Sequence, residues 1–433
     1  MTSLEAQLAE MKSFEAIKYV LNDIVLHDLQ CIDVMKMIAS KRAIVSYVTG
    51  LGKTVLAAAV MKLLWNEDPT RKFIFFGTFD QLSQTPAKLE KMLGRKVISS
   101  FASADSIEQL FAEGYENYSV LFLTHGVLHK DSIMNSLFKH KDLYTGIFID
   151  EAHRLSNTGS ASSANVMAGV ARQFEYCFAL TATPITTAVK QMAKLACIVD
   201  STRFKNPARL GNDLLAGRYL VDEEPCFFIN RGRAEFGSEA KYNAKVEWVE
   251  PLPHQKTECG GYKLFLQCKG PGAVPQAYAL VKLIKEREGR RGLIYVNQHE
   301  VREWILPFLD DAGIRYECVN GHTKLEERAR IMQAFNVDKT LDVVVTSVTT
   351  ALDLDCDFVI FYEFTVDVQQ MIGRAHRGLG NKEMDVIFVV TENSSETDYF
   401  FNNIYNISMV IQDILHQDYS VVERVGQELH VKD

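Results

Sequence analysis

The chain has 433 residues, of which 47% are hydrophobic and 24% are charged. This composition excludes fibrous and largely disordered classes, and the length is enough for two or three domains that each bury a core. The formal net charge of −8 argues against a surface covered throughout by nucleic acid, although it is compatible with a local basic groove.

The eight cysteines are scattered without a C-x-x-C pair, which argues against zinc sites and disulfides and favours a reducing compartment. The first twenty residues contain acids and lack the apolar core of a signal peptide. No apolar run reaches the roughly 18 residues that a membrane span requires. We therefore expect a cytoplasmic protein with no membrane partner.

Short apolar runs alternate with helical patterns over the first 200 residues, which is typical of a parallel sheet covered on both faces. The opening 30 residues space their apolar side chains near 3.6 residues and predict one or two helices. Further helices are expected at 55–65 and 81–93. The expected strands are 43–48, 73–76, 119–123, 146–149 and 176–180.

The second half of the chain repeats this alternation after an irregular segment. Strands are expected at 246–249, 293–296, 315–319, 341–345, 358–362 and 386–390. The sequence therefore predicts an α/β protein with a first domain over 1–205, a linking region over 206–245 and a second domain over 246–433.

A phosphate-binding loop is indicated between the strand expected at 43–48 and the helix after it. Glycines at alternate positions let backbone amides wrap phosphate oxygens at the positive end of a helix. Lys53 would reach the β- and γ-phosphates of ATP, and the Thr54 hydroxyl would hold Mg²⁺. The full Walker pattern has glycine where this chain has Tyr47, and a glycine-rich turn with an incidental lysine is the alternative. The residues predicted to bind ATP here are Thr49, Gly50, Leu51, Gly52, Lys53 and Thr54.

An acidic pair ends the expected strand at 146–149. Asp150 would bind Mg²⁺ through its water shell, and Glu151 would orient and deprotonate the attacking water. His153 would couple the site to a neighbouring segment, unless it only caps or packs locally.

Two threonines, Thr181 and Thr183, end the strand expected at 176–180. Their small polar groups could hydrogen-bond the acidic pair and report the nucleotide state. The same residues could also form an ordinary turn.

Four motifs, in this order, resemble motifs I, II, III and VI of superfamily 2 DEAH-box helicases and translocases. They are G-L-G-K-T at 50–54, D-E-A-H at 150–153, T-A-T-P at 181–184 and Q-M-I-G-R-A-H-R at 370–377. The resemblance spans about residues 25–395. It implies two tandem RecA-like domains, each a parallel sheet flanked by helices, with an ATP cleft between them and nucleic acid bound across both.

The resemblance also implies roles for individual residues around the nucleotide. Arg374 and Arg377 would be arginine fingers that reach the γ-phosphate from the second domain, where a fork-shaped cation meets developing charge. Their alternative is a pair of solvated arginines on a helix. Gln370 would contact the nucleotide or the attacking water. Gln30 is similar to the glutamine that reads adenine, and Asp353 would lie near the nucleotide sugar.

Weaker similarities place nucleic-acid contacts in both domains. Thr124 and His125 resemble part of motif Ib, Asn297 resembles part of motif IV, and Thr346 and Ser347 resemble part of motif V. Hydroxyls and amides of this kind grip phosphates without reading bases. The basic cluster at 285–291 could line a DNA path, or it could be a solvated helix end.

The G-R-A-H-R-G-L-G sequence from residue 373 is close to that of Swi/Snf-type translocases, so duplex, forked or branched DNA is the expected partner, favoured over RNA. The chain looks like a minimal, monomeric phage- or virus-type motor in the cytoplasm of a bacterium or an infected host cell. Its expected task is fork remodelling, branch migration or unwinding in replication, recombination or repair. The alternatives are a viral-type RNA helicase, a transcription-associated NTPase, and a nucleotide-binding scaffold without turnover.

Overall fold

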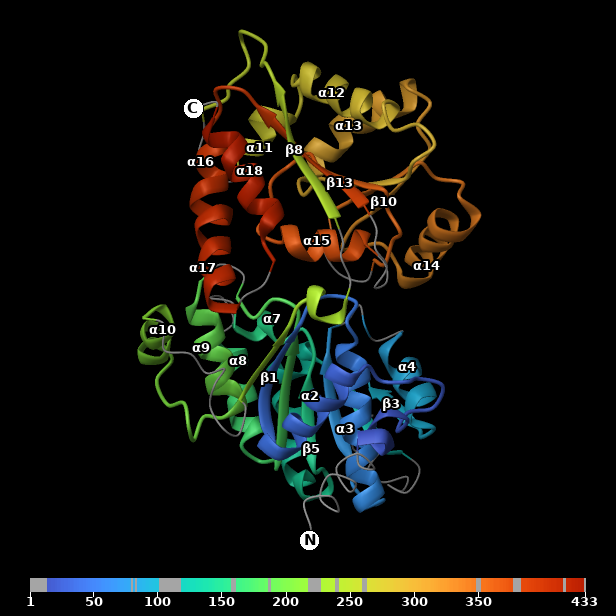
Figure 1. Ribbon diagram of the computed structural model, residues 1–433, viewed down its shortest axis with the longest axis vertical. Coiled ribbons are helices and arrows are strands. Elements are labelled where there is room, and N and C mark those ends of the chain that lie inside the picture. Colours follow the sequence, from blue (N-terminus) through green and yellow to red (C-terminus); the bar gives the residue numbers. More distant parts are fainter. Residues whose placement is uncertain are drawn as a thin grey trace. The chain divides into compact units, whose positions relative to one another are not determined.

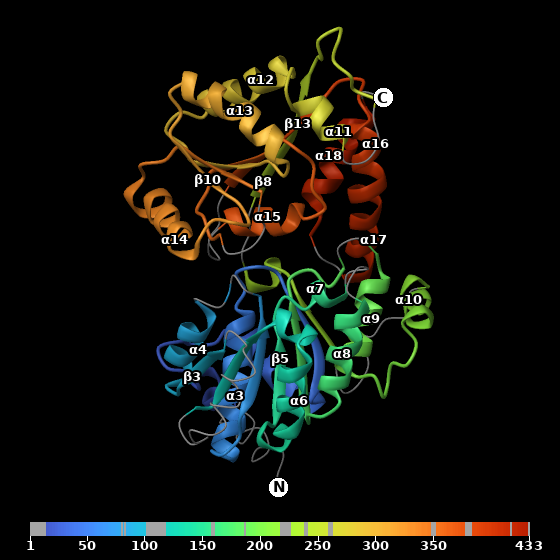
Figure 2. The ribbon, with the colours of Figure 1, turned by 180° about the vertical axis from the view of Figure 1, so that it is seen from behind.

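The protein was analysed as a computed structural model, which describes residues 14–78, 81, 84–100, 118–156, 161–185, 188–216, 227–237, 241–258, 263–347, 352–376, 383–415 and 418–431. The chain divides into two compact units, Met1–Gly232 and Arg233–Asp433. Each unit is built on one parallel sheet with helices packed against it (Figures 1 and 2). The predicted fold class, two parallel α/β domains, is confirmed.

The sheet of the first unit has seven strands in the order β3-β4-β2-β5-β6-β1-β7, and every ladder is parallel. The central strands are buried on both faces, which is why they read as nearly continuous apolar runs. The strands are β1 Arg42–Tyr47, β2 Phe73–Gly77, β3 Val97–Ser100, β4 Val120–Thr124, β5 Gly146–Ile149, β6 Tyr176–Thr181 and β7 Phe228–Arg231.

Helices lie over both faces of this sheet, with α2 in front in Figure 1 and α6 in front in Figure 2. The α-helices are α2 Asp28–Ser40, α3 Lys53–Glu67, α4 Thr85–Leu93, α6 Asp131–Lys139, α7 His153–Ser156, α8 Ala161–Ala171, α9 Lys190–Val199 and α10 Pro207–Leu215. Two 3₁₀ turns, η3 His125–His129 and η4 Lys141–Leu143, also belong to this unit, and residues 14–18 are helical.

Two strands of the first unit, β3 and β7, are absent from the expected set. The β3 sequence is V-I-S-S and the β7 sequence is F-I-N-R, so each has too few apolar residues for a recognisable strand pattern. The segment 206–245, expected to be a linking region, contributes α10 and β7 to the first unit and the start of β8 to the second. Pairing with β1, which no local pattern reveals, makes 228–231 a strand.

The sheet of the second unit has six parallel strands in the order β10-β11-β9-β12-β13-β8. Its expected strands are all present, with β8 and β13 longer than expected. The strands are β8 Lys241–Val249, β9 Gly292–Tyr295, β10 Tyr316–Val319, β11 Val343–Thr346, β12 Phe358–Phe361 and β13 Glu383–Thr391.

Helices α12 and α13 pack on one face of this sheet through Leu280, Leu283, Val301 and Ile305, and α15 lies on the other face (Figures 1 and 2). The α-helices are α11 Lys263–Lys269, α12 Val274–Lys285, α13 His299–Asp311, α14 Leu325–Gln333, α15 Val368–Ala375, α16 Glu396–Phe400, α17 Asn406–Leu415 and α18 Ser420–His430. A 3₁₀ turn, η6 Ala234–Phe236, and two π-helical segments, η7 Ala334–Asp338 and η8 Phe401–Tyr405, are also present.

Strands β7 and β8, which precede and follow the division of the chain, are each the edge strand of their own sheet. The edge of β8 is partly covered, because the Val246 amide donates a hydrogen bond of 2.7 Å to Glu428 Oε2 on α18. A covered edge strand is protected from pairing with other chains.

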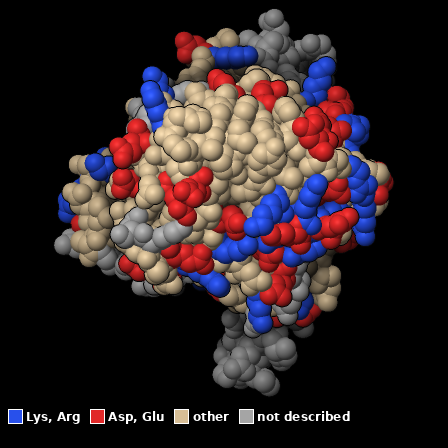
Figure 3. Space-filling view, turned by 90° about the horizontal axis from the view of Figure 1, so that it is seen from above, with Lys and Arg blue, Asp and Glu red and all other residues tan. Residues whose placement is uncertain are grey.

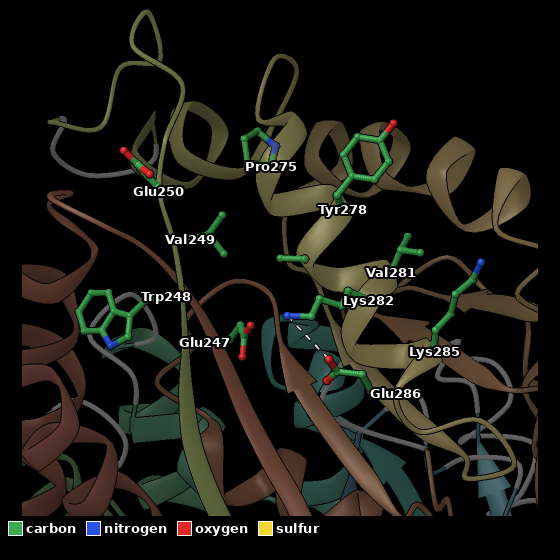
Figure 4. Close-up of a pocket in the computed structure, with 11 residues that line it drawn as sticks. Glu247, Trp248, Val249, Glu250, Pro275, Tyr278, Val281, Lys282, Lys285 and Glu286 are labelled. Carbon is green, nitrogen blue, oxygen red and sulfur yellow. Dashed lines mark ion pairs between the residues drawn. The ribbon is translucent and has the colours of Figure 1, made fainter.

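A groove of about 920 Å³ lies between the end of β8 and α12 (Figure 4). Tyr278 and Pro275 stand above it, Lys282 and Glu286 pair across 3.7 Å, and Trp248 lies on the far side of β8.

Figure 3 views the molecule from above and shows uncharged surface bordered by intermixed basic and acidic side chains. Among the helices that the structure describes, none combines the length and hydropathy that crossing a bilayer demands.

Candidate active site

The phosphate loop joins β1 to α3 and has the backbone form that anion binding requires. Gly50 and Gly52 have φ values of +89° and +93°, in the left-handed region that favours glycine. Gly52 caps α3 without any side-chain hydrogen bond, so the first amides of the helix face the loop. A Cβ atom at Gly52 would lie 2.8 Å from Gln30 Nε2. Only glycine therefore fits this position without movement of Gln30.

Backbone carbonyls hold the polar side chains around this loop. Lys53 Nζ donates to the Tyr47 carbonyl at 3.0 Å, and Gln30 Nε2 donates to the Leu51 carbonyl at 2.9 Å. Gln30 Oε1 also accepts from the His27 amide at 2.9 Å, which completes the capping box of α2. The sequence predicts that Gln30 reads adenine. In the structure its side chain connects the start of α2 to the phosphate loop through the Leu51 carbonyl. Thr49 is buried and Thr54 is half-buried beside Lys53.

Asp150 stands at the carboxyl end of β5 with a buried carboxylate. Its Oδ2 accepts from Gln81 Nε2 at 2.8 Å, and its Oδ1 accepts from the Glu151 amide at 2.9 Å. Burial, with repulsion from Glu151, raises the pKa of Asp150 to about 6, while Lys53 and the two hydrogen bonds act in the opposite direction. The Asp150 carboxylate therefore lacks full compensation of its negative charge.

A divalent cation would supply that compensation, and the donor set fits Mg²⁺. Mg²⁺ binds through one or two protein oxygens, substrate phosphates and several waters, so Thr54 and Asp150 would suffice. Among the described residues there is no group of three or more His, Cys, Asp or Glu side chains arranged around a metal. Such a group is not needed for a cation held chiefly by phosphate and water. The site is thus suited to a cation that arrives with its nucleotide.

Glu151 and His153 extend the acidic end of β5 toward β6. Glu151 has φ +48°, a left-handed conformation that is uncommon outside glycine, asparagine and aspartate. His153 Nδ1 lies 3.5 Å from Glu151 Oε2 and 3.0 Å from Thr181 Oγ1. Burial lowers the pKa of His153, and the Glu151 carboxylate partly opposes this. The Thr181 hydroxyl also accepts from the Thr183 amide at 3.1 Å, so one hydroxyl joins the ends of both strands.

His125 belongs to the same cluster, although the sequence predicts a nucleic-acid contact for it. Burial, with the positive charge of Arg154 and the nearby His153, lowers the pKa of His125 to about 4, and the Asp150 backbone provides its hydrogen bond. Thr124, the residue before it, ends β4 and is half-buried. His125 thus lies beside the acidic pair as a neutral side chain.

In the second unit, Arg374 on α15 meets Asp353. Arg374 Nη1 lies 3.1 Å from Asp353 Oδ1, and the Arg374 carbonyl accepts from the Leu354 amide at 2.9 Å. The neighbouring Gln370 is buried on the same helix. Arg377, the other predicted finger, lies outside the described residues. The structure therefore brings together two residues predicted near the nucleotide, Arg374 and Asp353, within one unit.

The predicted nucleic-acid contacts of the second unit lie at one edge of its sheet. Thr346 ends β11 and pairs in register with Tyr295, which ends the neighbouring β9. Asn297 is exposed beyond β9, and Ser347 is half-buried beyond β11. Neighbouring strands of a parallel sheet finish at the same end of the sheet. Asn297 and Ser347 therefore both lie at the carboxyl end of this sheet.

Glu363 anchors this edge. It is fully buried after β12, and its Oε2 accepts from the amides of Asn297 and Gln298, the latter at 2.9 Å. Burial raises the pKa of Glu363 to about 7. A buried carboxyl group thus fixes the segment that leads into α13.

The basic cluster at 285–291 lies at the opposite, amino-terminal edge of the same sheet. Arg287 Nε and Arg290 Nη1 pair with Asp385 at 3.1 and 2.8 Å, and Arg291 donates to the Phe335 carbonyl. These three arginines have structural partners within the unit, so the structure favours a structural role over a DNA path.

The contacts of three residues, Gln81, Glu363 and Asp33, were not anticipated from the sequence. Their partners Asp150, Asn297 and Arg231 lie far along the chain, so no local spacing indicates the contacts. The one available signal for Asp33 is its place as an acid in the helical pattern of α2, where it is fully buried. Buried acids need partners, and that need points to a network.

Comparison with known proteins adds two family matches. Residues 11–186 match the family described as "Type III restriction enzyme, res subunit", and residues 276–378 match "Helicase conserved C-terminal domain". The first range contains the phosphate loop and the acidic pair, and the second contains Arg374. These matches confirm the enzyme class predicted from the motifs, a nucleic-acid-dependent ATPase of the helicase type.

Curated relatives are similar over a limited stretch. The chain is 27% identical over 138 residues to Helicase SWR1 of Yarrowia lipolytica and 28% identical over 134 residues to that of Eremothecium gossypii. These alignments cover 30% and 29% of this chain but only 8% and 9% of the relatives, so the match spans less than a tenth of their length. A solved structure, the Sulfolobus solfataricus SWI2/SNF2 ATPase core in complex with dsDNA, aligns over 96% of this chain and 98% of its own at 16% identity and a TM-score of 0.44.

Proposed function

Because the chain carries both parts of a superfamily 2 helicase core, we propose that it is an ATP-dependent DNA translocase or helicase. It couples hydrolysis of ATP with Mg²⁺ to movement on duplex, forked or branched DNA. The observation that carries the hydrolytic part is the position of the Asp150 carboxylate, which is buried at the carboxyl end of β5 and held there by Gln81 and by the Glu151 amide.

The first unit supplies the groups that phosphoryl transfer needs. The amides of Gly50 and Gly52 and the Lys53 ammonium would bind the phosphates, with Lys53 leaving the Tyr47 carbonyl for them. Thr54 and Asp150 would hold Mg²⁺, which neutralises charge on the phosphates. Glu151 would orient the attacking water and accept its proton.

Arg374 and Arg377 are proposed to serve the same reaction as the cations that stabilise the charge developing on the γ-phosphate, with Gln370 contacting the nucleotide or the water. The fork-shaped guanidinium suits this task, because it donates two parallel hydrogen bonds to phosphate oxygens. Arg374 is paired with Asp353 in the structure, so that pair would open as the arginine binds phosphate.

The nucleic-acid site is proposed to include the edge that carries Asn297, Thr346 and Ser347. Amides and hydroxyls there can contact phosphates and leave bases unread, as translocation over any sequence requires. The G-R-A-H-R-G sequence from residue 373, which is close to that of Swi/Snf-type translocases, supports DNA as the nucleic acid along which the protein moves. Such a motor, acting as a monomer, suits fork remodelling, branch migration or unwinding in replication, recombination or repair.

A single ATPase assay tests the proposal. The purified chain is given ATP and Mg²⁺ with no nucleic acid, or with single-stranded, duplex, forked or four-way DNA, or with RNA. Duplex or branched DNA should stimulate hydrolysis at least ten-fold, whereas Glu151→Gln should bind ATP and hydrolyse almost none. If only RNA stimulates hydrolysis, the protein is an RNA helicase and not a DNA translocase. If no nucleic acid supports hydrolysis, the protein is a nucleotide-binding scaffold without turnover.

A further inference from the structure

Tyr47 stands where the full Walker pattern has glycine, and its side chain enters a buried three-residue network. Its hydroxyl donates to Asp33 Oδ2 on α2 at 2.6 Å. Arg231 binds the same carboxylate with both arms of its fork, through Nε to Oδ2 and Nη2 to Oδ1, each at 2.8 Å. Asp33 is fully buried, and the two partners share its oxygens. We call Asp33, Tyr47 and Arg231 the anchor triad.

The anchor triad reaches the phosphate loop through the backbone. The carbonyl of Tyr47 accepts the Lys53 ammonium at 3.0 Å. The next amide, of Val48, donates to the Arg231 carbonyl at 3.2 Å, and the Val48 carbonyl accepts from the Leu51 amide at 3.2 Å. Movement of Tyr47 or Arg231 therefore changes the position of the carbonyls that hold Lys53 and Leu51.

The anchor triad also reaches the end of the first unit. Arg231 is the last residue of β7, and the first unit ends at the following residue, Gly232. Strand β7 pairs with β1 over only four residues, from Ile44 with Phe228 to Tyr47 with Arg231. Asp33 is thus the side-chain anchor of a short edge strand whose end continues directly into the second unit.

The chemistry of the three residues suits positioning. A buried carboxylate is strongly destabilised when a partner is removed, so Asp33 holds Arg231 and Tyr47 in one geometry. Burial, with the negative charge of Asp33, raises the pKa of Tyr47, which keeps its phenol protonated as a donor. Lysine cannot reproduce the two-armed contact of Arg231.

We propose that the anchor triad positions the phosphate loop and links its geometry to the chain segment that leads into the second unit. Tyr47, Asp33 and Arg231 are positioning residues for nucleotide binding and for its coupling to nucleic acid. The coupling part rests on the proposed function, whereas the nucleotide-binding part does not.

The test uses the full chain and two substitutions that remove few atoms, Tyr47→Phe and Arg231→Lys. The matched control is Arg42→Lys, which removes a fork that donates to the Val199 and Ala171 carbonyls, away from the phosphate loop. For each variant the melting temperature, the Kd of a fluorescent ATP analogue and the stimulation of ATPase by duplex DNA are measured.

The expected result is a rise of about ten-fold in nucleotide Kd for Arg231→Lys and a smaller rise for Tyr47→Phe, while Arg42→Lys lowers the melting temperature and leaves Kd unchanged. Stimulation by DNA should fall with Arg231→Lys, and the double variant should lose no more than the larger single loss, because both residues act through one carboxylate. If neither substitution raises Kd beyond the Arg42→Lys control, the positioning role is wrong. If the unchanged chain shows no DNA-stimulated hydrolysis, the proposed function fails, and the Kd comparison alone still decides the positioning role.

Discussion

His153 Nδ1 lies 3.0 Å from Thr181 Oγ1 and 3.5 Å from Glu151 Oε2, so one imidazole joins the ends of β5 and β6. Because the Thr183 amide also donates to this hydroxyl, a shift of Glu151 on nucleotide binding would be transmitted to the segment after β6.

Replacing Thr181 with valine should therefore uncouple hydrolysis from nucleic acid. Valine keeps the shape of the side chain and removes the hydroxyl that both His153 and Thr183 contact. We expect the stimulation of ATPase by duplex DNA to fall about ten-fold, with the Kd of ATP nearly unchanged. Thr181→Ser, which restores the hydroxyl, is the control, and equal stimulation in the valine variant and the unchanged chain would contradict the coupling.

Gln81→Ala should raise the Mg²⁺ concentration needed for hydrolysis. The amide of Gln81 donates to Asp150 Oδ2 at 2.8 Å and orients the carboxylate proposed to hold the cation. Loss of such an outer partner costs about 10- to 100-fold in metal affinity. The measurement is the Mg²⁺ titration of ATPase at saturating ATP. Gln173→Ala, an exposed change in the same unit, is the control, and an unshifted titration for Gln81→Ala would remove Gln81 from the site.

Arg374→Ala should abolish most hydrolysis while ATP still binds. A cation that meets charge only in the transition state contributes about 10³- to 10⁵-fold to turnover and little to ground-state binding. Arg377→Ala should behave in the same way. Single-turnover hydrolysis and direct binding of an ATP analogue separate the two effects. Normal turnover in both variants would mean that these arginines have no part in the reaction.

Glu363→Gln should change how stability depends on pH. Burial raises the pKa of Glu363 from 4.5 to about 7, so the folded chain keeps a proton that the unfolded chain releases. The stability contributed by this proton is complete below pH 4.5 and is lost as the pH rises through 7.

Glutamine cannot ionise, and its Oε1 can accept the Asn297 and Gln298 amides. Relative to the unchanged chain, the variant should therefore gain about 1 to 3 kcal/mol in the free energy of unfolding between pH 5 and pH 8. Urea unfolding of the second unit across this range measures the gain. If the free energies of unfolding of the variant and of the unchanged chain depend on pH in the same way, Glu363 is not a buried titrating group.

Lys269→Met should destabilise the second unit more than any single change at a surface pair. Lys269 Nζ and Glu396 Oε2 lie 3.3 Å apart with both side chains fully buried, and Lys269 also donates to the Val389 carbonyl at 2.6 Å. Removing one partner leaves a buried charge and costs about 3 to 5 kcal/mol.

The double variant Lys269→Met with Glu396→Gln should recover most of that loss, because the Glu396 carboxylate is no longer left buried without its partner. Lys282→Met, at the exposed pair with Glu286, should cost less than about 1 kcal/mol. Thermal and urea unfolding compare the three variants. A double variant as unstable as Lys269→Met would show that packing, and not the unpaired charge, causes the loss.

The fold was largely predictable because parallel strands buried on both faces leave unbroken apolar runs in the sequence. Phe73–Gly77 and Phe358–Phe361 are examples in which nearly every residue is apolar and buried. Strands β3 and β7 lack this signal, since they are short edge strands that depend on a neighbour for their conformation.

The candidate site also contains residues whose placement could be predicted from the sequence and residues whose contacts could not. The placement of Lys53 after a glycine turn and of Asp150 and Glu151 at a strand end could be predicted, because the apolar runs that mark β1 and β5 end just before these residues. The contacts of Gln81, Asp33 and Glu363 could not be predicted, because each residue acts through one contact that only the folded sheet creates. Their roles follow from buried oxygens and distances, which no spacing along the chain encodes.

The two edge strands at the division of the chain differ in how they would resist tension along the backbone. Tension along the backbone at Gly232 pulls on the end of β7 and on the start of β8. Strand β8 shares a nine-residue ladder with β13, whereas β7 has four residues on β1, so β7 would detach first under tension. The two-armed contact of Arg231 with Asp33 lies at the point where such detachment would begin. These two hydrogen bonds would hold the end of β7 in place and raise the force needed to detach this short edge strand from β1.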